Sequence, residues 1–200
     1  MFKRNTNKKA ANVERILASG TKEEKRQLLQ DSNEDAVILR SAIALAEMGD
    51  LQRGEAEEII GRIRFWSFHP TKLMKLANVI EQKYPELAAS MLRKLWDSAP
   101  GDREEIIAAL KRLKASKHMI EIVKSQKSLS ANYTGKDEFT VSFNSTLDQI
   151  NVEVHHLDQV VKALFELGDK QALSELSDDV SVFPYLREQA KRYLEKLNAG

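Results

Sequence analysis

Side chains suited to catalysis are few in this 200-residue chain. It contains no cysteine, which excludes disulfides, thiol catalysis and cysteine-bound metal sites. Glu153 and His156 have the Glu-x-x-His spacing that carboxylate-bridged metal bundles use twice. Because the spacing occurs once, we expect no metal or other cofactor and interpret the histidines as polar residues on helix faces. The four histidines are His69, His118, His155 and His156.

Other catalytic motifs are absent from the sequence. It contains no His-Glu-x-x-His pair, no phosphate-binding glycine loop and no Gly-x-Ser-x-Gly turn. The sequence therefore leaves enzyme activity uncertain and favours a protein that is not an enzyme.

Three aromatic residues within four positions, Phe65, Trp66 and Phe68, form the most unusual local cluster. They cannot all lie on one face of a helix. Trp66 continues an apolar stripe with Ile59 and Ile63, so we expect it in the core. Phe65 and Phe68 either pack against the next helix pair or are exposed to a protein partner, since aromatic side chains supply much of the energy at interfaces.

One stretch of the chain, residues 111–127, is rich in basic side chains. The whole chain has 31 basic and 30 acidic residues and a net charge of +1, so only a local patch could attract a polyanion. The stretch is either a solvated helix face or a surface that binds the phosphates of a nucleic acid. Its candidate nucleic-acid-binding residues are Lys111, Arg112, Lys114, Lys117, Lys124 and Lys127.

Most of the chain has the apolar spacing of amphipathic helices. We expect ten or eleven helices joined by short loops, and neighbouring helices should then be antiparallel. Thr21 and Glu24 form a capping box, Pro70 and Pro85 suit the first turn of a helix, and the longest helix should cover residues 147–167. The predicted fold class is therefore mainly all-α.

Residues 128–145 differ, because their apolar residues alternate with period two. This pattern, with a turn at Thr134–Asp137, predicts a β-hairpin inserted between helices. A lone hairpin is marginally stable in water, so it would pack on the helices or pair with a partner or a second copy of the chain. Its candidate partner-binding residues are Tyr133, Phe139 and Phe143.

A seven-residue phrase occurs twice, as Ala44–Asp50 and as Ala163–Asp169, with starts 119 residues apart. Each copy ends an apolar helix, and its glycine (Gly49 or Gly168) is typical of a helix C-terminus. The aspartate that follows should cap the next helix. The separation is close to three units of about 40 residues, a length typical of helix-pair repeats.

Around these phrases the chain resembles HEAT-type repeat proteins, especially the short repeats known from phycobilin lyases. The resemblance rests on Leu39-Arg40, Leu186-Arg187 and the Gly-Asp exits, and it covers residues 28–60 and 157–197. It implies a right-handed α-solenoid of antiparallel helix pairs in which Arg40 and Arg187 have structural roles. With the inserted hairpin, this is the predicted fold.

The predicted organisation is a basic flexible tail over residues 1–9 and one helical-repeat domain over 10–200. That domain comprises N-terminal helix pairs over 10–127, the hairpin over 128–145, and a long helix with a final helix pair over 146–200. No apolar run approaches the roughly 18 residues of a membrane span, so we expect no membrane contact and a cytoplasmic location.

Three functions remain open on the sequence. The first is a non-enzymatic scaffold that binds a protein partner through its concave face, the hairpin or both, and the hairpin could also form a homo-oligomer. The alternative is a nucleic-acid-binding protein that uses the basic stretch. The third is a lyase- or glycosylase-type enzyme on a HEAT-like scaffold, which would need a cleft lined by aromatic and acidic side chains with displaced pKa values.

Overall fold

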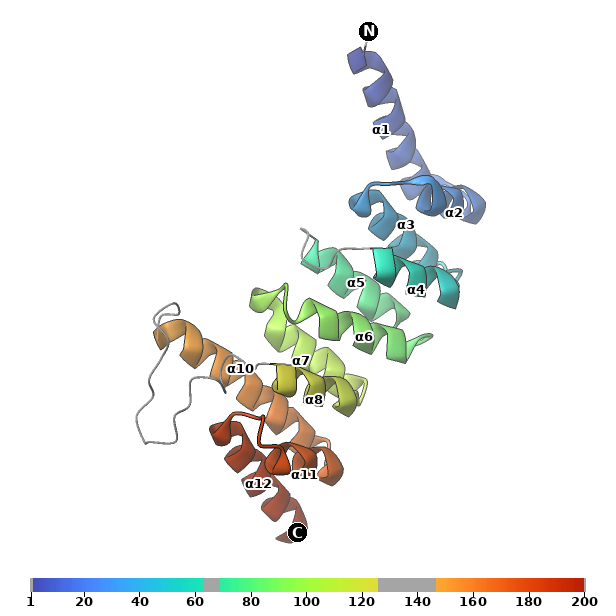
Figure 1. Ribbon diagram of the computed structural model, residues 1–200. Coiled ribbons are helices and arrows are strands. Elements are labelled where there is room, and N and C mark those ends of the chain that lie inside the picture. The colour runs from blue at the N-terminus through green and yellow to red at the C-terminus, as the bar shows by residue number, and fades with distance from the viewer. Residues whose placement is uncertain (1, 63–68, 126–146, 200) are drawn as a thin grey trace. The chain divides into compact units, whose positions relative to one another are not determined.

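A computed structural model describes residues 2–62, 69–125 and 147–199 of the chain (Figure 1). These residues form eleven α-helices and one 3₁₀ turn, and they contain no strand. None of the described helices is both long enough and apolar enough to cross a membrane.

The chain divides into two compact units, Met1–Ser98 and Ala99–Gly200, whereas the sequence predicted one domain over 10–200. Unit 1 contains α1 (Phe2–Ser19), α2 (Lys22–Asp31), α3 (Asp35–Glu47), α4 (Arg53–Arg62), α5 (Pro70–Ile80) and α6 (Pro85–Leu95). Unit 2 contains η1 (Pro100–Asp102), α7 (Arg103–Arg112), α8 (Ser116–Ser125), α10 (Leu147–Glu166), α11 (Lys170–Asp178) and α12 (Pro184–Ala199). Helix α1 begins at Phe2 and so includes residues predicted as a tail.

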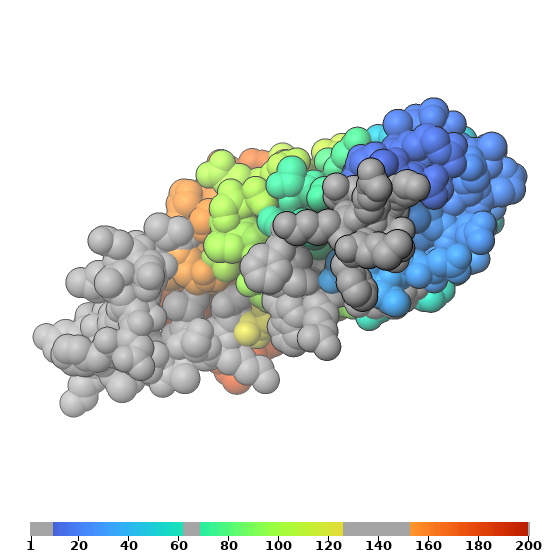
Figure 2. All heavy atoms as spheres, turned by 90° about the horizontal axis from the view of Figure 1, so that it is seen from above, coloured from blue at the N-terminus to red at the C-terminus, as the bar shows by residue number. Residues whose placement is uncertain are grey.

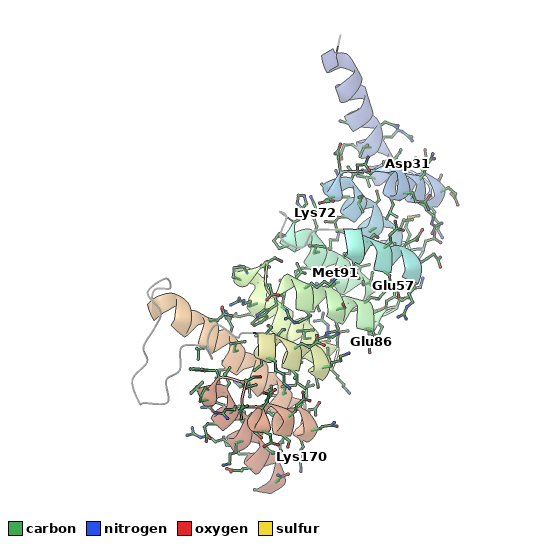
Figure 3. The ribbon with its side chains drawn as sticks, viewed as in Figure 1. Asp31, Glu57, Lys72, Glu86, Met91 and Lys170 are labelled. Atoms are coloured by element: carbon green, nitrogen blue, oxygen red, sulfur yellow. The ribbon has the colours of Figure 1, made fainter. Side chains whose placement is uncertain are left out.

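Unit 1 is built around α3 and α5. Helix α3 packs against α2, α4 and α5, and α5 packs against α6. Leu39 and Leu45 of α3, Leu73 of α5 and Met91 of α6 are at most 1% exposed, and Met91 is labelled in Figure 3. Apolar burial on this scale is the main stabilising contribution to such a layer of helices.

Unit 2 is built around α10, the 20-residue helix that the sequence predicted over 147–167. Helix α10 packs against α7, α8, α11 and α12. Its apolar stripe of Leu157, Val161 and Leu164 is fully buried, because residues three, four and seven apart lie on one side of a helix. The opposite sides of α10 are left for polar side chains.

The predicted helix boundaries are largely confirmed. The Thr21 hydroxyl accepts a hydrogen bond from the Glu24 backbone N–H, and the Glu24 carboxylate accepts one from the Thr21 backbone N–H. Pro70 and Pro85 lie in the first turns of α5 and α6. Gly49 and Gly168, which follow α3 and α10, both have φ of +69°, a left-handed conformation that favours glycine.

The two aspartates of the repeated phrase have different roles. Asp169 caps α11 as predicted, since its carboxylate accepts a hydrogen bond of 2.9 Å from the Ala172 N–H. The same prediction was wrong for Asp50, which forms ion pairs with Lys22 (3.1 Å) and Arg26 (2.8 Å) of α2. In its place, Glu55 accepts the Gln52 backbone N–H at the start of α4.

The predicted fold class, a helical solenoid with an inserted β-hairpin, is corrected to an all-helical fold on the described residues, which contain no strand. Residues 128–145, where the hairpin was predicted, lie outside the described residues. Two short runs of alternating residues are weak evidence for a sheet, because a two-stranded hairpin needs a further strand or a packing surface for stability.

Candidate functional site

Two lysines of the basic stretch 111–127 form ion pairs with acidic residues from other parts of unit 2. Lys111 pairs with Glu166 of α10. Lys124 pairs with Glu175 at 2.7 Å and with Asp179 at 2.8 Å. These acids lie more than 50 residues further along the chain, so the local sequence gave no sign of them.

The other described members of the basic stretch are exposed at the surface of unit 2. Lys114 and Lys117 are exposed, and Lys114 has φ of +52° at the end of α7. Arg112 is exposed but has an interaction partner, and Lys127 lies outside the described residues. The charge available for phosphate is therefore smaller than the sequence suggested.

The Glu-x-x-His spacing also has a structural explanation. Glu153 forms an ion pair with Arg103 of α7, and both side chains are largely buried. Burial is the main cause that lowers the pKa of His156, and the nearby Arg103 guanidinium lowers it further. Among the described residues, no group of three potential ligands is placed to hold a metal ion.

A hollow of about 380 Å³ lies between α7 and α10 of unit 2. Its described lining is Glu104, Ile107, His155 and Gln159. The proposed lyase or glycosylase chemistry would need aromatic and acidic groups with displaced pKa values in a cleft. This described lining has no aromatic side chain, and it gives that chemistry no support.

The candidate partner-binding residues Phe65, Phe68, Tyr133, Phe139 and Phe143 lie outside the described residues. The structure therefore does not locate them, and they remain predictions from the sequence.

A hollow of about 710 Å³ lies in unit 1 between α1, α2 and α3. We call it the α1–α3 hollow. Its apolar lining comes from Val13 of α1, Leu28 of α2 and Val37 of α3, together with Ala10 and Ala36. Val13 and Leu28 are only half-buried, so apolar surface remains open to a ligand. Figure 2 shows the atoms of α1 in dark blue against those of α2.

Acidic side chains border the α1–α3 hollow. Asp31 ends α2 and Glu34 lies just before α3, and both are exposed; Asp31 is labelled in Figure 3. Neither carboxylate has an ion pair within the described residues. The apolar hollow therefore has a negative rim that is free to attract a cation.

The Arg40–Glu14 ion pair forms one wall of the α1–α3 hollow. Two nearly equal hydrogen bonds of 2.6 Å join the Arg40 guanidinium to both oxygens of Glu14, the bidentate geometry that favours arginine. The hydrogen bonds from Arg40 lower the pKa of Glu14. The pair fixes α1 to α3, in keeping with the structural role expected for Arg40.

The same ion pair lines a second hollow of about 330 Å³ between α1, α3 and α5. Lys72 and Lys75 of α5 lie on its far side, and Lys75 pairs with Glu47 at 2.7 Å. Lys72 is labelled in Figure 3. Because its rim carries both signs of charge, this hollow selects less clearly between partners than the α1–α3 hollow does.

Sequence reasoning did not find the α1–α3 hollow, because its lining comes from three helices between residues 10 and 40. The sequence did contain one signal for it, the apolar stripe of Val13, Ile16 and Leu17. This stripe gives α1 an apolar face that is too long for one short neighbouring helix to cover. No known protein family, curated protein or solved structure matches the chain.

Proposed function

We propose that the protein is a non-enzymatic helical-repeat scaffold of the cytoplasm, and that its α1–α3 hollow binds a basic amphipathic helix of a protein partner. The observation that carries the proposal is the apolar lining of this hollow beside two carboxylates, Asp31 and Glu34, that form no ion pair with the described side chains. Grooves of this kind receive the apolar face of a helix, and charge at the rim sets which partner binds.

The position of α1 supports a helical partner. In Figure 1, α1 extends beyond the α2–α3 pair. The half-buried Val13 shows that the apolar side of α1 is only partly covered by α2 and α3. A partner helix that lies along α1 would cover this side and place basic side chains beside Asp31 and Glu34.

Binding to a nucleic acid has less support. That function needs several free cations along one surface, and Lys111 and Lys124 are paired with acids of α10, α11 and the turn after α11.

The proposal can be tested with two fluorescent peptides that match in length and apolar content. One is a basic leucine–lysine amphipathic helix, and the other is its leucine–glutamate counterpart. We expect fluorescence anisotropy to detect saturable binding of the basic peptide only, and added salt should weaken it. The double substitution Asp31→Lys and Glu34→Lys should weaken binding roughly two- to thirtyfold, because each exposed charge pair contributes about 0.2–1 kcal/mol.

The charge-reversal variant should remain folded, because a lysine at position 31 suits the negative end of the α2 dipole. Glu195→Lys, at an exposed position of α12 in unit 2, is the matched control and should bind the basic peptide normally. Equal binding of both peptides, or unchanged binding by the charge-reversal variant, would show that the α1–α3 hollow is not the site.

A further inference from the structure

Asp158 of α10 has a carboxylate without a polar partner among the described residues. Its Oδ1 atom is buried and accepts no hydrogen bond from them. Burial raises the pKa of this carboxyl group, against the opposing effect of His155 and Lys162. A desolvated carboxylate without a partner costs free energy, which a bound cation would recover.

His155 and Lys162 of α10, about one helical turn before and after Asp158, are the charged residues that act on this carboxyl group. The Lys162 ammonium lies 4.0 Å from Glu166, on the next turn of α10. Neither residue forms an ion pair with Asp158, so no described cation of the chain neutralises it.

Aromatic side chains of α10 and α12 lie beside Asp158. The rings of Phe165 and Tyr193 stack with their centroids 4.7 Å apart and their planes 19° apart. Burial raises the pKa of the Tyr193 phenol, and the charge of Asp158 is the next largest cause. Tyr185 also affects this phenol and is 43% exposed. Asp158 and Tyr185 thus lie near enough to Tyr193 for their charges to affect its phenol, and we call Asp158, Phe165, Tyr185 and Tyr193 the α10–α12 face.

Helix geometry explains why these four residues meet. Asp158 and Phe165 are seven residues apart on α10, and Tyr185 and Tyr193 are eight apart on α12. Both intervals are about two helical turns, so each pair lies on one side of its helix. Because α10 packs against α12, the two sides form adjoining walls.

A cation is already held by one of these rings. The Lys196 ammonium lies 5.5 Å from the centroid of the Tyr193 ring, within the range of a cation–π contact. Lys196 and Tyr185 are both exposed, so a second cation can approach this part of α12 from the solvent.

We propose that the α10–α12 face binds an arginine or lysine side chain of a protein partner, with Asp158 as the anion and Tyr185 and Tyr193 as the aromatic wall. A protein is favoured over a small amine because Val180, in the turn before α12, and Tyr185, in its first turn, are 84% and 43% exposed. A protein surface is large enough to cover both of these exposed side chains, whereas a small amine is not.

This inference rests on the proposed function in one respect, since both assume that the partner is a protein. The site itself is a separate one, in unit 2. The two sites can therefore fail independently. Substitutions of Asp31 and Glu34 test the α1–α3 hollow, and substitution of Asp158 tests the α10–α12 face.

The probe is a short capped peptide with one arginine between leucines, and its control contains citrulline, which has nearly the same shape without the charge. The full chain is titrated with each peptide, and the ring signals of its four tyrosines are followed by NMR. We expect the arginine peptide to shift the Tyr185 and Tyr193 signals, and we expect the Tyr84 signal of unit 1 to serve as the internal reference.

Asp158→Asn should weaken arginine-peptide binding at Tyr185 and Tyr193 roughly ten- to a hundredfold, the range for a hydrogen bond to a charged group. The matched control Glu188→Gln, at an exposed position of α12, should leave it unchanged. The same tyrosine shifts should persist in the variant with Asp31→Lys and Glu34→Lys.

Stability gives a second test. Asp158→Asn should leave the melting temperature unchanged or raise it, because it removes an unpaired buried charge. A clear loss of stability would mean that the carboxylate has a partner within the chain, and the proposal would then be wrong. Equal binding of the arginine and citrulline peptides would also overturn it.

Discussion

At the scale of single residues, Asp50 and Asp169 show how one sequence phrase serves two purposes. Asp169 accepts the Ala172 N–H and caps α11. Asp50 instead holds Lys22 and Arg26 of α2, and hydrogen bonds from those side chains lower its pKa. The first role needs an oxygen atom, whereas the second needs a negative charge.

Asparagine substitution should separate the two roles. We expect Asp169→Asn to leave the free energy of unfolding nearly unchanged, because asparagine caps helices as well as aspartate, and Asp169→Ala to lower it by about 1 kcal/mol. Asp50→Asn should lower stability in low salt, and this loss should shrink as salt is added. Urea unfolding at two salt concentrations measures these differences. A salt-sensitive loss for Asp169→Asn would contradict the capping role.

At the scale of helices, Lys124 joins α8 to the end of α11. Its ammonium pairs with Glu175 and Asp179, and these hydrogen bonds raise its pKa, Asp179 having the larger effect. In return, hydrogen bonds from Lys124, and then from Ser181, hold the pKa of Asp179 far below its ordinary range.

The ion pair between Lys124 and Asp179 should make the free energy of unfolding depend on pH in acid solution. Because the pKa of Asp179 is lower in the folded state, the unfolded state binds the extra proton as the pH falls below the ordinary value of about 4. The stabilising contribution is complete above that pH and is lost below it. Lys124→Met should therefore lower the free energy of unfolding by about 1 kcal/mol at neutral pH, and the difference should shrink below about pH 4. Urea unfolding at neutral and acid pH measures it.

Lys170→Met, in the first turn of α11, is the control for this prediction. Lys170 is exposed and is labelled in Figure 3. Its removal should cause no loss of stability that depends on pH. A difference between Lys124→Met and the natural chain that persisted undiminished in acid would contradict the proposed role of Asp179.

The helices could be predicted from the sequence, because the residues that begin and end a helix act locally. Pro70, the Thr21–Glu24 box and Gly168 act on backbone groups within a few residues of themselves. The partners of Lys111 and Lys124 were not readable, since they lie more than 50 residues away and depend on how helices pack. For the same reason the sequence could not predict that Asp158 lacks a polar partner among the described residues. That property depends on which side of α10 faces α12.

At the scale of the whole molecule, the chain consists of two compact units. The long-range ion pairs described above each lie within one unit: Arg26–Asp50 and Arg40–Glu14 in unit 1, and Arg103–Glu153 and Lys124–Asp179 in unit 2. Each unit also has its own buried apolar residues, such as Leu39 in the first and Leu164 in the second.

We therefore expect residues 1–98 and 99–200, produced separately, each to show helical circular dichroism and a cooperative thermal transition, as compact domains with their own cores do. Fragment 99–200 should also keep the arginine-peptide response of Tyr185 and Tyr193. If neither fragment unfolds cooperatively, the two units depend on one another for folding.

The turn at Gly49–Leu51 is bonded to two other parts of unit 1. Lys22 and Arg26 of α2 form ion pairs with Asp50. From the turn after α5, Lys83 donates hydrogen bonds to the carbonyl oxygens of Gly49 and Leu51, and the Tyr84 hydroxyl donates one to the Leu51 carbonyl oxygen. The turn between α3 and α4 is thus bonded both to α2 and to the turn between α5 and α6. The combination of these polar residues at their spacing would identify evolutionary relatives of this chain more selectively than its apolar pattern, which helix pairs of many kinds share.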